Sequence, residues 1–395
     1  MTTPARARVL VLNWRDTRHP EGGGSELYVE EIAAGLAARG HAVTSFSAAY
    51  AGAARRETVD GVRVVRRGGR FSVYAWAALL YLTGRLGRPD VVVDVGNGVP
   101  FWSPLYCRRP IVLLVHHVHR EQWPVFFGPR LAALGWWLEA RAMPRAYRRA
   151  RVVTVSESTR RELAALGVRG PISVVHNGTP PPLVVPRRAP APTICVLGRL
   201  VPHKRVEQVL TAAARLRDEV AGLRVDVAGQ GYWLDRLRAH ARALGVDDIV
   251  TFHGHVRNEA KSRLLGAAWV LALPSLKEGW GLSVVEAAAH GTPAVASAAA
   301  GGVTESIRDG LTGLLVEDEA GLVDALRLLL VDDEARERMG AAARDFATGF
   351  SWASAGERFG SVLDEAIGAA GPVPEAGAVE PVPQPRADGV SAARR

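Results

Sequence analysis

Two glutamates, Glu278 and Glu286, stand at the ends of the stretch EGWGLSVVE, which has a Gly-Trp-Gly turn near its start. The stretch follows an apolar strand-like run and continues into an apolar helical pattern that ends at a glycine. This order would place the amides of Gly281, Leu282 and Ser283 in the first turn of a helix, where unpaired N–H groups attract phosphate. We expect the two carboxylates beside such a site to bind hydroxyl groups, a ribose at Glu286 and a sugar at Glu278. The alternative for Glu286 is a helix-terminal charge that is favourable with the dipole.

Two cations precede this stretch in GRLVPHK, residues 198–204. The segment follows the apolar run TICVL and leads into a helical pattern, so Arg199 and Lys204 should lie at the carboxyl edge of a sheet. Two fixed cations at that edge suit an anion, and a diphosphate in particular. The chain contains no GxxxxGK[ST] sequence, so this segment is not a P-loop. The alternative is that both side chains are solvated loop cations.

The first half of the chain carries a glycine loop. Strand-like RVLVLN leads through RHPEGGGSE into the helical pattern ELYVEEIAAGLAARG. Gly23 and Gly24 in this loop would let the backbone approach a ligand closely, which a side chain would prevent. The alternative is a plain turn.

A histidine cluster also lies in the first half. In IVLLVHHVHREQW, residues 111–123, His116, His117 and His119 follow a buried strand. A zinc site is a poor interpretation, because adjacent histidines point to different sides and no other ligand cluster accompanies them.

The elements that must position these residues alternate between strand-like and helical patterns along the chain. Several strand candidates are uniformly apolar, as parallel strands covered on both faces are. The proline-rich segment PPPLVVPRRAPAP interrupts the alternation and favours an interdomain linker. We therefore expect an α/β fold of two Rossmann-like domains, with ligands bound in the cleft between them at the carboxyl ends of their strands. The predicted parts are an N-terminal domain over 1–179, the linker over 180–192, a second domain over 193–350, a closing helix over 351–370 and a disordered tail over 371–395.

Composition and charge exclude several classes of protein. The net charge of +9 is uneven, because residues 1–186 hold 25 Arg against 13 acidic residues, a balance of +12. These arginines form no known recognition element, so we expect no nucleic-acid partner. Cys107 and Cys195 offer neither a disulfide framework nor a metal site, which fits the cytoplasm. Without a signal core or an apolar run of about 18 residues, we expect neither secretion nor a membrane span.

Two segments of the basic half mix Trp, Tyr, Leu and Arg, namely RFSVYAWAALLYLTGRLGR and FFGPRLAALGWWLEARAMPRAYRRARV. This combination suits an interfacial helix or a lipid-linked anionic acceptor, and with it peripheral contact with the inner face of a membrane. Two core helices with arginine rims are the alternative.

The chain resembles the retaining nucleotide-sugar glycosyltransferases of the GT-B fold, in the large family 4 that includes sucrose synthase and bacterial mannosyltransferases. The resemblance covers about residues 8–365 and rests on an ordered set of segments: a GGxxE-type loop, GRLVPHK, DVAGQG, FHGHV and EGWGLSVVE. It implies that Arg199 and Lys204 neutralise the donor diphosphate, which removes the need for a metal or another cofactor. It also implies that Glu286 binds the nucleotide ribose and Glu278 the sugar hydroxyls.

The same resemblance assigns backbone contacts to the donor. Gly23 and Gly24 would lie near the donor phosphate and the acceptor, and the backbone at His255 and Val256 would meet the nucleobase. Trp280 replaces the phenylalanine that is common at its position. The amides that would line the sugar and phosphate are those of Gly279, Trp280, Gly281, Leu282 and Ser283.

For the reaction, the resemblance implies transfer of a hexose-type sugar from a nucleoside diphosphate sugar to an acceptor hydroxyl, with retention at the anomeric carbon. The acceptor would be a small molecule or lipid-linked. His116 would face the reacting sugar, with His117 and His119 as rivals. The alternatives are a nucleotide-sugar epimerase or a sugar phosphorylase on the same fold, or a non-catalytic nucleotide-sugar-binding scaffold.

Overall fold

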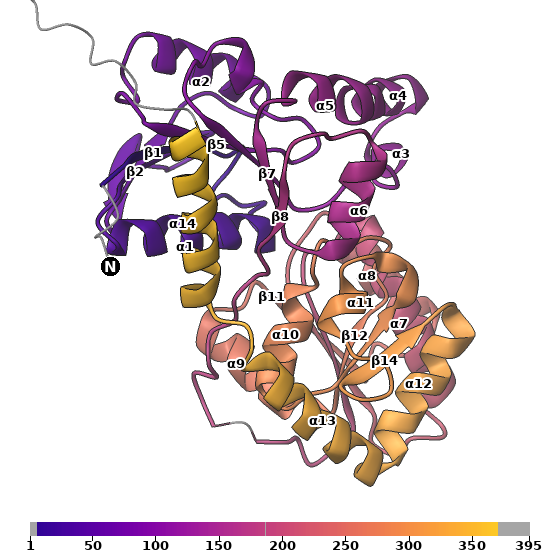
Figure 1. Ribbon diagram of the computed structural model, residues 1–395. Helices are drawn as coiled ribbons and strands as arrows, with labels where there is room; N and C mark the ends of the chain where they lie inside the picture. Colours follow the sequence, from indigo (N-terminus) through magenta and orange to yellow (C-terminus); the bar gives the residue numbers. More distant parts are fainter. Residues whose placement is uncertain (1–5, 186, 370–395) are drawn as a thin grey trace, which may run out of the picture.

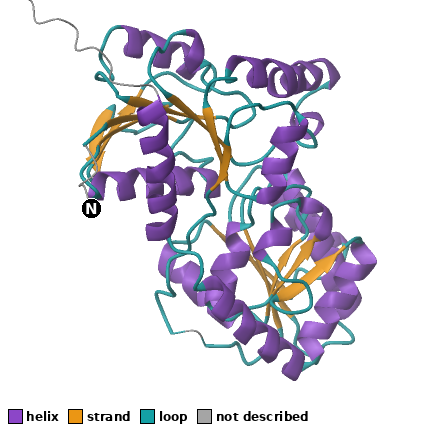
Figure 2. Cartoon of the chain, in the orientation of Figure 1, coloured by secondary structure: helices purple, strands orange, loops and turns teal. Residues whose placement is uncertain are grey.

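The computed structural model describes residues 6–185 and 187–369. The predicted disordered tail over 371–395 lies outside these residues. The chain forms two mainly parallel sheets, one before the proline-rich segment and one after it, and helices cover both (Figure 2). The predicted α/β fold of two Rossmann-like units is confirmed.

The first sheet has eight strands in the order β3-β4-β2-β1-β5-β6-β7-β8. They are β1 (Arg8–Leu12), β2 (Ala42–Ser47), β3 (Arg56–Val59), β4 (Val62–Arg66), β5 (Val91–Val95), β6 (Ile111–Val115), β7 (Arg151–Thr154) and β8 (Ile172–Val174). Neighbouring strands are parallel except for β3 with β4. The sequence analysis missed β3, because this edge strand, RETV, is partly exposed and lacks an apolar run.

Alternating residues of the first sheet face two separate layers of core. Val9 and Val11 of β1 pack with Tyr28 of the helix α1, whereas Leu10 and Leu12 pack on the opposite face. The helices of this half are α1 (Gly24–Ala38), α2 (Val73–Leu82), α3 (Trp123–Phe126), α4 (Pro129–Trp137), α5 (Met143–Ala146) and α6 (Glu157–Ala165), with the short turns η1 (Ser103–Leu105) and η2 (Leu138–Ala142).

The second sheet has six parallel strands in the order β11-β10-β9-β12-β13-β14. They are β9 (Thr193–Leu197), β10 (Arg224–Ala228), β11 (Val250–Gly254), β12 (Val270–Leu273), β13 (Ala294–Ser297) and β14 (Gly313–Val316). The helices and short turns of this half are η3 (Pro202–Lys204), α7 (Val206–Leu216), α8 (Leu234–Ala243), α9 (Asn258–Ala267), α10 (Leu282–Ala289), η4 (Ala298–Ala300), α11 (Val303–Ser306), α12 (Glu319–Val331) and α13 (Asp333–Ala347). The strands β9 and β12 are neighbours, so the loops that follow them lie side by side at one edge.

The last helix returns to the first sheet. α14 (Trp352–Ala369) lies across α1, as the yellow and indigo helices of Figure 1 show, and its Phe359 and Leu363 join the core around Val9 and Tyr28. The apolar face of this closing helix therefore completes the N-terminal half of the molecule, although the chain has already passed through the second sheet.

Two expectations about the chain as a whole concern its helices and cysteines. Within the described ranges, none of the helices combines the length and the apolar character that crossing a bilayer requires. Cys107 and Cys195 are both free and buried, so the expectation that they form no disulfide is confirmed.

Candidate active site

The carboxyl edge of the second sheet brings the predicted cations and carboxylates together. Arg199 follows β9 and Lys204 ends the short turn η3, while Glu278 follows the neighbouring β12. Lys204 Nζ lies 2.5 Å from Glu278 Oε1, in a largely buried ion pair. Lys204 and Glu278, which were predicted to bind different parts of a ligand, therefore neutralise each other in this structure.

Arg199 lies at the same edge and is half-buried. Its guanidinium makes neither a hydrogen bond nor an ion pair with any described residue. Burial lowers the pKa of its guanidinium, as does the nearby Arg15, although Glu26 and Glu278 oppose this effect. A desolvated guanidinium without a partner is well suited to an anionic ligand.

The Gly-Trp-Gly turn is fixed by close backbone contacts. Gly281 precedes α10 with a φ of +83°, a left-handed conformation that glycine adopts without strain. A Cβ added to Gly279 would lie 2.4 Å from the carbonyl oxygen of His116, and one added to Gly302 would lie 1.9 Å from the carbonyl oxygen of Gly279. The turn therefore requires Gly302 as well, which the sequence analysis did not identify.

The first turn of α10 has the free amides that were predicted. The amides of Leu282 and Ser283 donate no hydrogen bond to the rest of the described chain, whereas Val284 N donates to Gly281 O at 2.9 Å. These two N–H groups come directly after the Gly-Trp-Gly turn that follows Glu278. They are therefore available to phosphate oxygens at the positive end of the helix.

Glu286 is buried in α10 and is bound by a lysine that the sequence analysis missed. Lys261 of α9 places its Nζ 2.6 Å from Glu286 Oε1. The chain contains three lysines, and each of them pairs with a glutamate. This scarcity of lysine could have drawn attention to Lys261 in the sequence. The pairs are Lys204 with Glu278, Lys261 with Glu286 and Lys277 with Glu162.

The side chain of Trp280 lies in an aromatic cluster. Its ring stacks on His176 with a centroid distance of 4.3 Å and meets the edge of Phe350 at 5.1 Å. The indole is buried, and its Nε1 has no partner among the described residues. Trp280 can therefore offer its backbone, and not its ring, to a donor.

The glycine loop of the first sheet reaches the second sheet. A Cβ added to Gly23 would lie 3.4 Å from Arg199 Nε, and one added to Gly24 would lie 3.5 Å from a methyl carbon of Leu282. These contacts place both glycines against Arg199 and the start of α10. Gly23 and Gly24 therefore lie where the two halves meet, and their contact with a donor phosphate stays a prediction.

Glu26 anchors this loop from inside α1. Its carboxylate is fully buried and accepts hydrogen bonds from Gly23 N at 2.8 Å and Arg15 Nε at 3.0 Å. Burial by itself would raise the pKa of Glu26, but the charges of Arg15 and Arg199 outweigh burial and hold it below its ordinary value. The glycine motif contained Glu26, but the sequence analysis gave neither Glu26 nor Arg15 a role.

Among the three clustered histidines, His116 borders this region most closely. Its carbonyl oxygen lies against Gly279, and its ring meets Tyr28 edge-on at 5.3 Å. Burial lowers the pKa of His116 to about 4, so the ring is neutral at pH 7. Its buried Nε2 finds no hydrogen-bond partner among the described residues.

The rival histidines are engaged elsewhere. His117 Nε2 lies 3.3 Å from Gln122 Oε1, and His119 Nδ1 lies 2.9 Å from Glu139 Oε1. The Trp123 indole donates to the same glutamate at 2.8 Å. These bonds organise the loop after β6, and the assignment of the sugar-facing histidine remains a prediction.

Val256 lies in the loop after β11, two strands from β9. The side chain of Val256 is half-buried and that of His255 is exposed. The loops between this point and Arg199 pack backbone against backbone, because Gly229 N donates to Gly254 O at 2.8 Å and a Cβ added to Gly229 would lie 1.8 Å from Gly198 O. Val256 therefore shares the carboxyl edge with Arg199, and its contact with a nucleobase stays a prediction.

Two polar contacts hold the second half against α6 of the first. Glu305 of α11 accepts hydrogen bonds from the amides of Glu157 and Ser158, both at 2.7 Å, at the positive end of α6. Lys277, which precedes Glu278, pairs with Glu162 of the same helix.

Residues 22–183 match the family described as Glycosyltransferase Family 4, and residues 185–346 match the family described as Glycosyl transferases group 1. A segment of 176 residues is 39% identical to a D-inositol 3-phosphate glycosyltransferase of Kribbella flavida, covering 42% of this chain and 41% of that protein. A segment of 166 residues is 35% identical to a GDP-mannose-dependent alpha-(1-6)-phosphatidylinositol monomannoside mannosyltransferase of Mycobacterium tuberculosis, covering 40% and 43%. The matches span about two fifths of the length of these curated relatives.

The fold has close counterparts among solved structures. A sucrose-phosphate synthase from Thermosynechococcus elongatus superposes with a TM-score of 0.79 at 20% identity, over 92% of this chain and 100% of the other. The two family matches follow each other along the chain, one for each sheet, in the order that the sequence segments indicated. The chain therefore belongs to family 4 of the GT-B glycosyltransferases.

Proposed function

We propose that the protein is a glycosyltransferase that moves a hexose-type sugar from a nucleoside diphosphate sugar to an acceptor hydroxyl. We further propose that it retains the anomeric configuration and uses no metal. One observation carries the proposal: the guanidinium of Arg199 has no partner among the described residues and lies against Gly23 of the opposite sheet, while the neighbouring Gly24 lies against Leu282, whose amide donates to none of them. Such a site is charged where a departing diphosphate develops charge.

In this proposal the donor diphosphate binds Arg199, Lys204 and the amides of α10. Arrival of the diphosphate gives Lys204 a second anion, which weakens its hold on Glu278. Glu278 can then accept hydrogen bonds from the sugar hydroxyls. Until the donor arrives, the ion pair between Lys204 and Glu278 keeps both side chains in place.

Glu286 is the group proposed for the nucleotide ribose. Lys261 fixes one oxygen of the Glu286 carboxylate, which leaves the other to accept from a hydroxyl. Lys261 thereby acts as a positioning residue for the donor.

The proposed sugar pocket also uses neutral polar groups of the first sheet. Asn13 follows β1 and His116 follows β6, and the buried Asn13 Oδ1 and His116 Nε2 have no hydrogen-bond partners among the described residues. Sugar hydroxyls would satisfy such atoms. With a pKa of about 4, His116 is suited to hydrogen bonding rather than to general acid catalysis at pH 7.

For the acceptor we propose a small molecule or a lipid-linked compound, with peripheral contact at the inner face of a membrane. The two named relatives act on an inositol phosphate and on a phosphatidylinositol mannoside. Two helices of the basic half expose apolar side chains that the core-helix alternative leaves unexplained. The exposed apolar side chains are Phe71, Leu79 and Leu82 in or beside α2, and Leu131, Leu134 and Trp137 on α4.

Membrane contact can be tested with matched serine variants. Leu79→Ser/Leu82→Ser should reduce sedimentation with vesicles that contain phosphatidylglycerol, because the variant loses exposed apolar area. Leu328→Ser/Val331→Ser, at exposed positions of α12, should not. Equal sedimentation of the two variants would contradict the proposed membrane face.

Transfer itself is tested by incubating the protein with a panel of UDP, GDP, ADP and dTDP sugars and a candidate acceptor. We expect one donor to release its nucleoside diphosphate together with a glycosylated product, equally well in the presence of a chelator. A free sugar phosphate would indicate a phosphorylase, and an epimerised donor would indicate an epimerase. Nucleotide binding without turnover would favour the scaffold, and loss of activity on chelation would contradict the metal-independent mechanism.

A further inference from the structure

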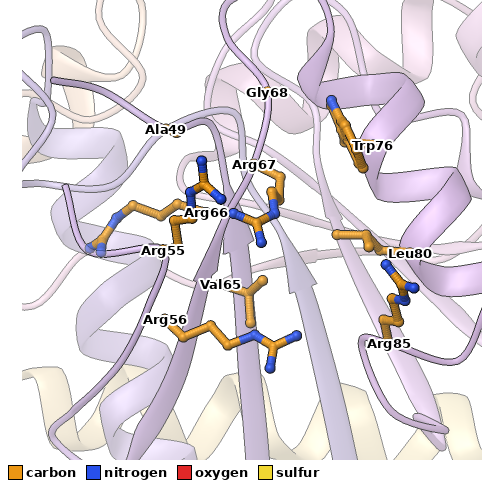
Figure 3. Close-up of a pocket in the computed structure, with 10 residues that line it drawn as sticks. All are labelled: Ala49, Arg55, Arg56, Val65, Arg66, Arg67, Gly68, Trp76, Leu80 and Arg85. Carbon is orange, nitrogen blue, oxygen red and sulfur yellow. The ribbon is translucent and has the colours of Figure 1, made fainter.

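A hollow of about 420 Å³ opens at the edge of the first sheet, away from Arg199 and Lys204. Its floor includes Val65 of β4 and Ala49, which follows β2. Trp76 and Leu80 of α2 form one wall (Figure 3). The site proposed for the donor is built on the second sheet, so this hollow is a separate feature of the acceptor half.

Arginine dominates the lining of this hollow, and none of the described residues contributes a carboxylate to it. Arg66 is buried and already neutralised, because it pairs with Asp16 at 2.5 Å and with Glu57 at 2.6 Å. The other lining arginines make no ion pair with any residue that the structure describes. They are Arg55, Arg56, Arg67 and Arg85.

The unpaired arginines approach the hollow from separate elements. Arg56 begins β3, Arg67 follows β4 and Arg85 follows α2. Figure 3 shows Arg56 and Arg85 reaching toward the space from opposite sides. Four cations that converge on a concave surface without a counter-charge repel one another, so a bound anion would stabilise the arrangement.

The hollow is connected to the loop that meets the donor site. Arg66 binds Asp16, and the same carboxylate accepts from the amides of Arg18 and His19, both at 3.1 Å. The loop then continues to Gly23, which lies against Arg199. The hollow therefore lies on the half of the molecule from which an acceptor would approach the transferred sugar.

We propose that this hollow binds a phosphate group carried by the acceptor. This inference rests on the proposed glycosyl transfer, because that function is what makes the ligand of the hollow an acceptor. Arginine matches phosphate through paired N–H donors, and the Trp76 and Leu80 wall packs against an apolar or ring portion of the same molecule. A soluble phosphate ester and a phospholipid headgroup share this chemistry.

The test compares two double variants of the full chain that lose the same charge. Arg56→Gln/Arg85→Gln removes two cations of the hollow. Arg161→Gln/Arg169→Gln removes two exposed arginines of the same half that lie outside its lining and outside the two segments proposed for membrane contact, and that form no ion pair with a described residue. Circular dichroism and unfolding midpoints establish that both variants are folded.

Binding is measured with glycerol 3-phosphate by calorimetry, and by sedimentation with phosphatidylcholine vesicles with and without phosphatidylglycerol. We expect at least one anionic probe to bind the wild type and the hollow variant to bind it about tenfold more weakly. The control variant should stay within about twofold of the wild type. Dependence on the hollow for glycerol 3-phosphate identifies a soluble ester, and dependence for anionic vesicles alone identifies a headgroup.

The inference is overturned if neither probe binds, or if both variants weaken binding equally, because the effect would then be one of net charge. These measurements need no donor, so they are independent of turnover. If the protein transfers sugar but the hollow variant binds phosphate as the wild type does, the proposed function stands and this inference is wrong. If the protein binds phosphate at the hollow but binds no nucleotide, the hollow is an anion site but its role in acceptor binding is contradicted.

Discussion

The two cationic regions of the molecule differ in how their charges are balanced. On the second sheet, Lys204 and Lys261 are each held by a glutamate within 2.6 Å, whereas the guanidinium of Arg199 pairs with none of the described residues. In the hollow of the first sheet, Arg66 alone is paired with carboxylates, and the four other arginines have no counter-charge among the described residues.

This difference in charge balance indicates how selective each region is for its ligand. A balanced site can hold its side chains in place before a ligand arrives, so binding exchanges one set of partners for another. An unbalanced site gains most from any suitable anion and discriminates less by geometry. We therefore expect sharp selectivity for the nucleotide donor and broader selectivity for the acceptor phosphate.

The largest effect should come from breaking the balanced site. Arg199→Gln/Lys204→Gln should lower kcat/KM by roughly 10²–10⁴-fold, since each charged contact contributes about 1.5–3 kcal/mol. The steady-state rate of nucleotide release measures this. Arg224→Gln/Arg242→Gln, exposed arginines of the same half, serves as the control. Near-normal turnover of the first variant would remove the diphosphate assignment.

A second prediction concerns His116, a neutral buried group of the first sheet that contrasts with the charged arginines of the hollow. The pKa of His116 is about 4 in the folded protein, below the ordinary 6.5, so the unfolded chain binds more protons between these values. Stability should therefore fall as the pH drops from about 6.5 to 4, with His116 contributing on the order of 3 kcal/mol.

Urea unfolding of the wild type and His116→Gln at pH 7 and pH 4.5 measures this contribution. The variant should lose less stability on acidification than the wild type does, whatever its stability at pH 7. An identical loss in both proteins would contradict the burial of a neutral His116.

A third prediction concerns the backbone that shapes the donor site. Gly302→Ala would place a Cβ 1.9 Å from Gly279 O, so the turn must shift, and we expect a loss of about 1–3 kcal/mol in the free energy of unfolding. Gly368→Ala, at an open helical position in α14, should be neutral or stabilising. Nucleotide affinity should fall only in the first variant. Equal behaviour of the two would mean that the turn tolerates displacement.

The smallest predicted effect lies at the contact between the halves. Glu305→Gln should weaken the hydrogen bonds to the first amides of α6 and lower the free energy of unfolding by about 1–2 kcal/mol. Glu319→Gln breaks an exposed pair with Arg215 and should cost about 0.5 kcal/mol or less. A loss for Glu305→Gln no greater than for Glu319→Gln would show that this contact does not hold the halves together.

Much of the fold could be predicted from the sequence, because buried parallel strands such as Ile111–Val115 and Val270–Leu273 are continuous apolar runs. The strand β3 could not, since an edge strand needs no such run. Within the site, Arg199 and Glu278 could be placed because each lies in the loop after a predicted strand of one parallel sheet.

The features that the sequence analysis missed depend on contacts between distant segments. Lys261 lies 25 residues from Glu286, on another helix, and the pair exists only once α9 and α10 have packed. The hollow draws Arg56, Arg67 and Arg85 from three segments that the strand order β3-β4-β2 and the position of α2 bring together. Arginine is too common in the first half for its spacing to indicate such a cluster.

The most direct test of the donor site is a calorimetric titration of the nucleoside diphosphates UDP, GDP, ADP and dTDP into the wild type, Glu286→Gln and the exposed control Glu259→Gln. We predict that one nucleotide binds the wild type and Glu259→Gln with similar affinity. Glu286→Gln should bind it about tenfold more weakly while binding inorganic pyrophosphate as the wild type does. Failure of every nucleotide to bind the wild type, or equal affinity in all three proteins, would contradict a donor site at the carboxyl edge of the second sheet.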